Sequence, residues 1–260
     1  MRFGLFLTTR HMLAEHPSAA VETHLAEVRL ARDLGYDSVF AGHHFLPYPL
    51  PMVQLWPLLG RISAEAGEMR IGTGVIILAA ANPLETAEQA ATLDALTNGR
   101  FTLGVGIGYR DEDVRAFAIP GKRARVFTEK LDVVRRLLES GHVTARGPGY
   151  DLDDDYMTLR CVRQPRCPIW MAATRDWGVR KAAELADTWL VSPLACIRDL
   201  ELWRERSLVG SPDSVVEQLR LYRDRLGATE ILFRPRWAGL DPRIGKQTLE
   251  LLAREVIPHV

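Results

Sequence analysis

Cysteine is scarce in this 260-residue sequence, which contains only Cys161, Cys167 and Cys196. Their spacing does not match that of zinc ligands, and their odd number does not suit a disulfide framework. We therefore expect free thiols in a reducing compartment, and we expect the protein to be cytoplasmic.

An excess of charge is also missing, because 33 basic residues balance 33 acidic ones. This balance gives no support to a nucleic-acid-binding surface, which needs a basic patch or stripe. Long apolar runs are missing too. The amino-terminal stretch MRFGLFLTTRHML has an apolar run too short for a signal-peptide core or a membrane span, and it fits a first strand. We expect neither nucleic acid nor a membrane as a partner.

Short apolar runs alternate with helical patterns along most of the chain. This alternation predicts an α/β fold with a parallel sheet, and the number of repeated units favours a single TIM-like (β/α) barrel domain over residues 1–260. A doubly wound sheet is the competing fold. The predicted strands cover residues 2–8, 37–45, 70–78, 100–108, 167–173, 187–193 and 229–235, and the predicted helices cover 19–36, 52–67, 82–99, 126–141, 176–186, 197–206, 215–226 and 243–257.

The region between residues 191 and 230 does not fit a complete barrel. It has two helical patterns, and SLVG at 207–210 is the only candidate strand. The seventh βα unit is therefore expected to be reduced or missing. Such a gap leaves a sheet edge that proteins normally cover, so we expect a homodimer.

Two adjacent histidines, His43 and His44, end the second predicted strand in SVFAGHHFLP. Catalytic groups in parallel barrels gather at the carboxyl ends of strands. Neighbouring residues in a strand point to opposite faces, so one imidazole is expected at the barrel mouth and the other toward the helices. This arrangement argues against a shared metal ion, and we expect no metal site. Two structural histidines, or one titratable group near neutral pH, remain the alternatives.

Two other strand ends carry residues suited to binding a cofactor. LGVGIGYRDED at 103–113 lacks the third-glycine spacing of a dinucleotide-binding fingerprint, so its glycines indicate either close approach of a flat ligand or tight packing. AATRDWGVRKAAELA at 172–186 runs from a strand directly into a helix. The helix start and Arg175 could bind an anion, or the segment could be a plain turn with a solvated arginine.

The chain resembles the bacterial luciferase-like monooxygenase family over nearly its whole length. The similar stretches include FGLFL, GYDSVFAGHHF, IGTGVIILAAANPLETAEQAATLDALTNGRFTLGVGIGYRDED, PIWMAATRDWGVRKAAELADTWLVSP and VGSPDSV. This resemblance implies a TIM-like barrel that binds FMN or the deazaflavin F420 at the carboxyl ends of its strands.

The resemblance also assigns roles to individual residues. His43 matches the catalytic histidine of the family, and Gly74–Val75 matches a non-prolyl cis peptide against which the flavin ring rests. Ile107 stands where luciferase has a phosphate-binding arginine, so Arg175 is expected to take that role. The residues expected to bind the cofactor are Phe6, Gly74, Val75, Gly106, Gly108, Tyr109, Arg110, Ala173, Thr174 and Arg175.

The activity that the resemblance implies is a monooxygenase reaction on a small organic substrate. It would use oxygen and reduced FMN delivered by a separate flavin reductase, with His43 as the general acid or base. One alternative is an F420-dependent oxidoreductase that transfers a hydride. Another is a flavin-binding protein without catalysis, because the shortened barrel resembles the non-fluorescent flavoprotein of luminous bacteria.

Overall fold

The computed structural model describes residues 1–191 and 208–260. The predicted helix over 197–206 and Cys196 lie outside these residues, as does the end of the strand predicted over 187–193. None of the helices in the described part of the chain is long and apolar enough to cross a membrane.

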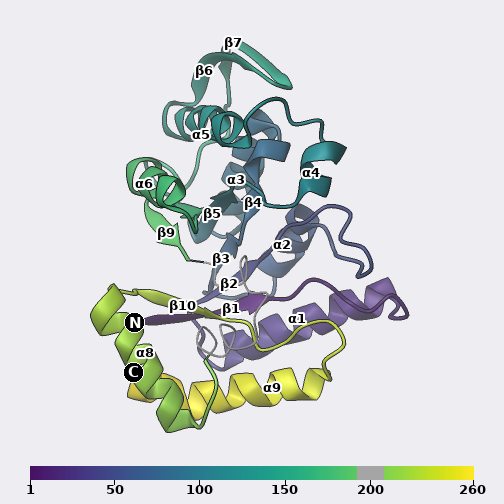
Figure 1. The fold of residues 1–260 in the computed structure, drawn as a ribbon, viewed down its shortest axis with the longest axis vertical. Helices are drawn as coiled ribbons and strands as arrows, with labels where there is room; N and C mark the ends of the chain where they lie inside the picture. Colours follow the sequence, from purple (N-terminus) through teal and green to yellow (C-terminus); the bar gives the residue numbers. More distant parts are fainter. Residues whose placement is uncertain (192–207) are drawn as a thin grey trace.

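A curled sheet of parallel strands forms the centre of the molecule (Figure 1). Its hydrogen-bonded order is β10-β1-β2-β3-β5-β8-β9, and the short strand β4 continues beside β5. Every pairing within it is parallel. The strands are β1 (Arg2–Leu7), β2 (Ser38–Ala41), β3 (Arg70–Thr73), β4 (Ile76–Ile77), β5 (Phe101–Gly106), β8 (Ile169–Ala172), β9 (Thr188–Leu190) and β10 (Glu230–Phe233).

Helices cover the outer face of this sheet, and α1, α8 and α9 lie together beside β1 and β10 (Figure 1). Side-chain caps and prolines start several of them. Ser211 accepts a hydrogen bond from the backbone N–H of Ser214 and precedes Pro212, which confirms the predicted helix start. The helices are α1 (Pro17–Asp33), α2 (Leu55–Ser63), α3 (Pro83–Leu96), α4 (Asp111–Ala116), α5 (Arg123–Ser140), α6 (Asp176–Leu185), α8 (Pro212–Leu226) and α9 (Pro242–Leu251), with shorter turns at Leu78–Ala80, Leu252–Val256 and Ile257–His259.

The two faces of each strand carry different residues. Apolar side chains at alternate positions pack outward against the helices and form the core, among them Leu5, Val39, Ile71, Leu103, Ile169 and Phe233. The positions between them face the inside of the curled sheet. The TIM-like barrel prediction is therefore confirmed as a partial barrel.

The barrel does not close on itself in the described part of the chain. Strands β9 and β10 are the two edges of the sheet, and no pairing joins them there. The described residues between these edges, 191 and 208–229, contain helix α8 and no strand. This agrees with the predicted loss of the seventh βα unit.

Two features differ from the sequence predictions. No strand was predicted between residues 108 and 167, but an antiparallel hairpin of β6 (His142–Gly147) and β7 (Tyr150–Tyr156) lies there. Strand β7 was not predicted because it is rich in aspartate, a residue that is depleted in sheets. Strand β2 ends at Ala41 rather than near residue 45, so its alternation of faces does not extend to the two histidines.

The packing of β5 against β3 leads to a stability prediction. A Cβ atom at Gly104 would lie 1.9 Å from the backbone oxygen of Thr73, whereas one at Gly60 in α2 would meet nothing within 4 Å. Gly104→Ala should therefore lower the free energy of unfolding by about 3 kcal/mol. The control Gly60→Ala should raise it by roughly 0.5–1 kcal/mol. Urea unfolding measures both, and equal effects of the two variants would contradict this packing.

Candidate active site at the carboxyl ends of the strands

The inside of the barrel is closed at its lower levels. Glu230 accepts hydrogen bonds from Ser38 at 2.6 Å and from Arg70 at 2.5 Å. Above them the rings of Phe40 and Trp170 stack with centroids 4.8 Å apart. Both rings are buried, so this layer forms an apolar floor.

The layer above this floor is lined mainly by residues with little or no side chain. Gly42, Gly74 and Ala172 follow the inward-facing positions of β2, β3 and β8, and all three are only partly buried. Phe6 is an aromatic residue of this layer. A Cβ atom at Gly42 would lie 3.5 Å from its ring, and one at Gly74 would lie 2.7 Å from it. Water therefore reaches a small-residue surface beside an aromatic ring, which suits a flat apolar ligand such as a flavin.

The Gly74–Val75 peptide bond is cis, as predicted. The Val75 side chain occupies the space that a side chain at position 106 would need, because a Cβ atom at Gly106 would lie 2.6 Å from it. Gly108 has φ +79° and is equally close to Ile77. Tight packing, the second of the two alternatives for these glycines, therefore explains both, and their contact with a cofactor stays a prediction.

His43 is held in one orientation by a short hydrogen-bonded chain. The side-chain N–H of Gln54 donates to the carbonyl of His44 at 3.4 Å, which leaves Gln54 Oε1 facing His43 Nε2 at 3.3 Å. Because this oxygen can only accept, Nε2 carries the hydrogen and Nδ1 is the basic nitrogen. His43 Nδ1 is buried and has no hydrogen-bond partner among the described residues.

The surroundings of His43 keep it neutral. His43 is only 8% exposed, and its ring meets the Phe45 ring edge-on, with the ring centroids 4.4 Å apart. Burial lowers its pKa, and the bond to Gln54 opposes this shift without cancelling it. A neutral imidazole with one free basic nitrogen can accept a proton and return it.

His44 lies beside the loop that follows β5. Its ring meets Tyr109 edge-on at 5.6 Å, and its Nδ1 is 4.0 Å from the Asp113 carboxylate. Burial, followed by the positive charges of Arg10 and Arg110, lowers the pKa of His44 to about 4. The sequence analysis expected one of the two histidines to face the helical layer, on the assumption that β2 continues through residue 45. Because β2 ends at Ala41, that assumption is wrong.

Arg110 joins the loop after β2 to the loop after β5. Its guanidinium donates to the carbonyls of Phe45 at 2.8 Å and Leu46 at 3.2 Å, and it lies 3.9 Å from Asp113. Asp113 is 2% exposed, and burial raises its pKa while Arg110 opposes the shift. The sequence interpretation treated this segment as a loop and so missed Asp113. The signal available was three consecutive acidic residues, Asp111 to Asp113, which is typical of a helix start.

Residues 173–175 lie at the end of β8, where helix α6 begins. Thr174 and Arg175 are exposed, and Ala173 is fixed by a hydrogen bond from the Trp189 indole N–H to its carbonyl at 2.8 Å. Strands β2, β3 and β5 separate β8 from β1. The predicted phosphate-binding residues therefore stand apart from Phe6 along the sheet, at the start of a ten-residue helix.

Two arginines after β10 were also missed from the sequence. Arg234 comes directly after Phe233, which pairs with Leu5 of β1. Its guanidinium lies 4.3 Å from the centre of the Phe6 ring. Arg236 is buried, bonds to the carboxylate of Glu27 and lies 3.2 Å from His24 Nδ1. Extending the alternation of β10 by one step beyond residue 233 identifies Arg234 as inward-facing.

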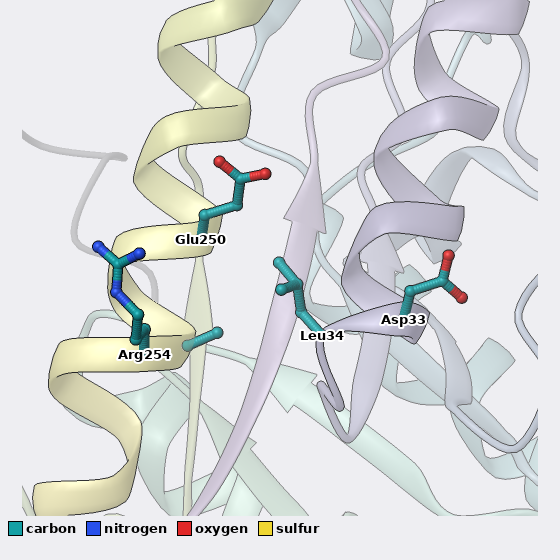
Figure 2. Close-up of a pocket in the computed structure, with 5 residues that line it drawn as sticks. Asp33, Leu34, Glu250 and Arg254 are labelled. Atoms are coloured by element: carbon teal, nitrogen blue, oxygen red, sulfur yellow. The ribbon is translucent and has the colours of Figure 1, made fainter.

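A surface pocket of about 570 Å³ lies elsewhere, between the end of α1 and the end of α9 (Figure 2). Asp33, Leu34, Glu250 and Arg254 line it. Helix α1 ends there just before β2 begins, so the pocket lies at the amino ends of the strands, away from both histidines. The active sites of parallel barrels lie at the other end, where the strands have their carboxyl ends.

Comparison with known proteins places the chain in a family. The family model described as luciferase-like monooxygenase matches residues 1–196. The chain belongs to the luciferase-like monooxygenase family.

Relatives within this family differ in function and length. The chain is 31% identical over 185 residues to a 4-hydroxyprotoasukamycin monooxygenase of Streptomyces nodosus subsp. asukaensis, covering 70% of this chain and 50% of the relative. It is 23% identical over 217 residues to an alkanal monooxygenase alpha chain of a Kryptophanaron alfredi symbiont, covering 80% and 60%. The chain thus spans about half the length of the curated relatives it matches first.

Solved structures share the fold over nearly the full chain. The monooxygenase RslO1 from Streptomyces bottropensis aligns with a TM-score of 0.85 at 20% identity, covering 100% of this chain and 99% of that one. The oxygenating constituent of 3,6-diketocamphane monooxygenase from Pseudomonas putida, in complex with FMN, aligns with a TM-score of 0.79 at 15% identity, covering 100% and 99%. The F420-dependent tetrahydromethanopterin reductase from Methanopyrus kandleri gives 0.77 at 17%, covering 99% of each chain.

The lowered pKa of His44 predicts acid sensitivity. The unfolded chain has a histidine pKa near 6.5 and the folded chain about 4, so between these values the unfolded chain binds more protons. Stability should therefore fall as pH drops from 6.5 to 4, by up to about 3 kcal/mol from this group. His44→Gln should show a shallower fall than the wild type or than His142→Gln, which removes an exposed imidazole. Urea unfolding at several pH values measures the slopes, and identical slopes would contradict the assignment.

Proposed function

We propose that this chain is a flavin-dependent monooxygenase that uses reduced FMN and oxygen to oxygenate a small organic substrate. Membership of the luciferase-like family supports this proposal. The observation that carries it is the pairing of a small-residue inner surface at the barrel mouth with a neutral, buried His43 beside it. A flat ring and a proton-transfer group would meet at this position.

The residues present fit a flavin. Phe6, Gly42, Gly74 and Val75 would hold the ring against the inner face, and Thr174 with Arg175 at the start of α6 would hold the phosphate. Tyr109 and Arg110 would border the ring from the loop after β5. When bound, the reduced flavin would supply the electrons with which oxygen is activated.

His43 would act as the general base and acid. Its Nδ1 accepts a proton from the reacting group, while Nε2–H remains bonded to Gln54 and fixes the ring orientation. His43 Nδ1 is buried, and this burial limits the access of water to it. A positioned acid–base group of this kind contributes roughly 10²–10⁴ in rate.

An F420-dependent hydride transfer is the second candidate. The fold similarity to the F420-dependent reductase, TM-score 0.77, nearly equals that to the FMN complex, TM-score 0.79. For the FMN reaction we propose a separate flavin reductase as partner. We also propose a homodimer, because the sheet edges at β9 and β10 are unpaired within the described part of the chain.

The choice of cofactor can be tested by absorbance titration of the purified protein with FMN, riboflavin and F420. We expect saturable binding of FMN, with a Kd at least tenfold lower than that for F420. Arg175→Gln should weaken FMN binding about tenfold and leave riboflavin binding unchanged, because only FMN carries the phosphate. Tighter binding of F420 would favour hydride transfer. Binding of neither cofactor would exclude both candidates.

The role of His43 can be tested by mixing the protein with reduced FMN and air-saturated buffer in the presence of small ketones, aldehydes and phenols. Incorporation of one oxygen atom, measured by mass spectrometry, should fall roughly 10²–10⁴-fold in His43→Ala. The control His142→Gln should keep the wild-type rate. Unchanged turnover in His43→Ala would remove His43 from the mechanism. Tight flavin binding without turnover would favour the non-catalytic alternative.

A further inference from the structure

The mouth of the barrel contains two arginines that have no acidic partner in the part of the chain that the structure describes. Arg10 follows β1 and Arg234 follows β10, its neighbour in the sheet. Within residues 1–191 and 208–260, neither guanidinium has a carboxylate within ion-pair distance, and neither side chain makes a hydrogen bond there. The inward-facing acid of β10, Glu230, is already paired with Arg70 at the lower level of the barrel.

The position of Arg234 is unusual for a surface arginine. Its guanidinium lies over the Phe6 ring, in the same layer as Gly42 and Gly74. Water reaches the side chain, yet protein surrounds it closely enough that desolvation, and then the charge of Arg10, lower its pKa to about 10. It stays charged at neutral pH. A cation held in this way presents its N–H groups to the space above the inner surface of the barrel.

The backbone that carries Arg234 is firmly anchored. Two residues further on, the buried Arg236 bonds to the carboxylate of Glu27 in α1, and the Arg236 carbonyl accepts a hydrogen bond from the Thr8 hydroxyl at 2.5 Å. These contacts tie the end of β10 to β1 and α1. The backbone at Arg234 is thus fixed, and the contact with the Phe6 ring restricts the guanidinium, which reduces the entropy lost when a ligand binds.

Charges around the two arginines reinforce the positive potential. Arg10 and Arg234 follow the neighbouring strands β1 and β10, and Arg110 donates to the carbonyl of Phe45, next to His44. The positive charges of all three lower the pKa of His44. Asp113 lies near Arg110 and His44 and offsets part of this charge, but it forms no ion pair with Arg10 or Arg234. A ligand that neutralises the remaining positive charge of Arg10 and Arg234 is therefore an anion.

We infer that Arg234, together with Arg10, binds a carboxylate group of the substrate at the mouth of the barrel. This inference rests on the proposed function and adds a substrate class to it, an organic acid whose apolar part lies toward Phe6. The planar guanidinium matches a carboxylate through two parallel N–H···O bonds. The cofactor phosphate is assigned to Thr174 and Arg175 at the end of β8, which three strands separate from β1. The anion at Arg234 therefore belongs to a second molecule.

The test uses calorimetric titration of the cofactor-free protein with benzoate, and with benzamide as its neutral analogue. Benzoate should bind at least tenfold more tightly than benzamide. Arg234→Gln and Arg10→Gln should each weaken benzoate binding at least tenfold and leave benzamide binding unchanged. Arg234→Lys should retain part of the affinity, because it keeps the charge and loses the paired geometry. The control Arg125→Gln, in an exposed ion pair on α5, should behave as wild type.

Three results would overturn the inference. They are equal binding of benzoate and benzamide, wild-type benzoate affinity in both Arg234→Gln and Arg10→Gln, and a loss of FMN affinity in Arg234→Gln that exceeds its loss of riboflavin affinity. The last result would assign the anion to the cofactor phosphate. Thermal unfolding of each variant checks that it is folded. Because benzoate is titrated without cofactor, a failure to bind FMN or F420 would count against the proposed function and leave the carboxylate site standing.

Discussion

Neighbouring strands of the central sheet run in the same direction from β10 to β9, and their shared hydrogen bonds bring all their carboxyl ends to one face. This constraint places groups that are far apart in the chain next to one another. Phe6 meets Gly42 and Arg234 because β1 lies between β2 and β10, and it meets Gly74 because β3 lies on the other side of β2 in the curled sheet. Without the parallel register, the two histidines would be isolated side chains at the end of one strand.

Large side chains fill the inside of the barrel at its lower levels, and small ones line it at the carboxyl ends of the strands. This change in side-chain size leaves that end open. Buried ion pairs and the Phe40–Trp170 stack fill the lower levels, whereas glycine and alanine line the level above. His43 directly follows Gly42 of this upper level, and its Nδ1 is buried without a hydrogen-bond partner among the described residues. A low-dielectric floor, a small-residue wall and a neutral imidazole together favour a flat redox cofactor whose chemistry needs one proton moved.

The sequence predicted the order of the elements and most of the barrel, because the two-residue and 3.6-residue periods of buried positions are strong signals. It did not predict that β2 ends at Ala41, so the alternation of faces was wrongly extended to His43 and His44. The β6–β7 hairpin was missed because aspartates dominate β7, and α4 was missed because six residues are too few to show a helical period. Arg234 was overlooked because its significance comes from the β1–β10 pairing, which is a long-range contact that local patterns do not encode.

A crystal structure of the protein soaked with FMN tests the central claim most directly, since that claim concerns where a ring lies. The account predicts density for the isoalloxazine ring over the Phe40–Trp170 floor, in contact with Gly74 and Val75 and within reach of His43 Nδ1. It also predicts the phosphate at the start of α6. A ring bound elsewhere, or a soaked crystal without density for a ring in contact with Gly74 and Val75, would contradict it.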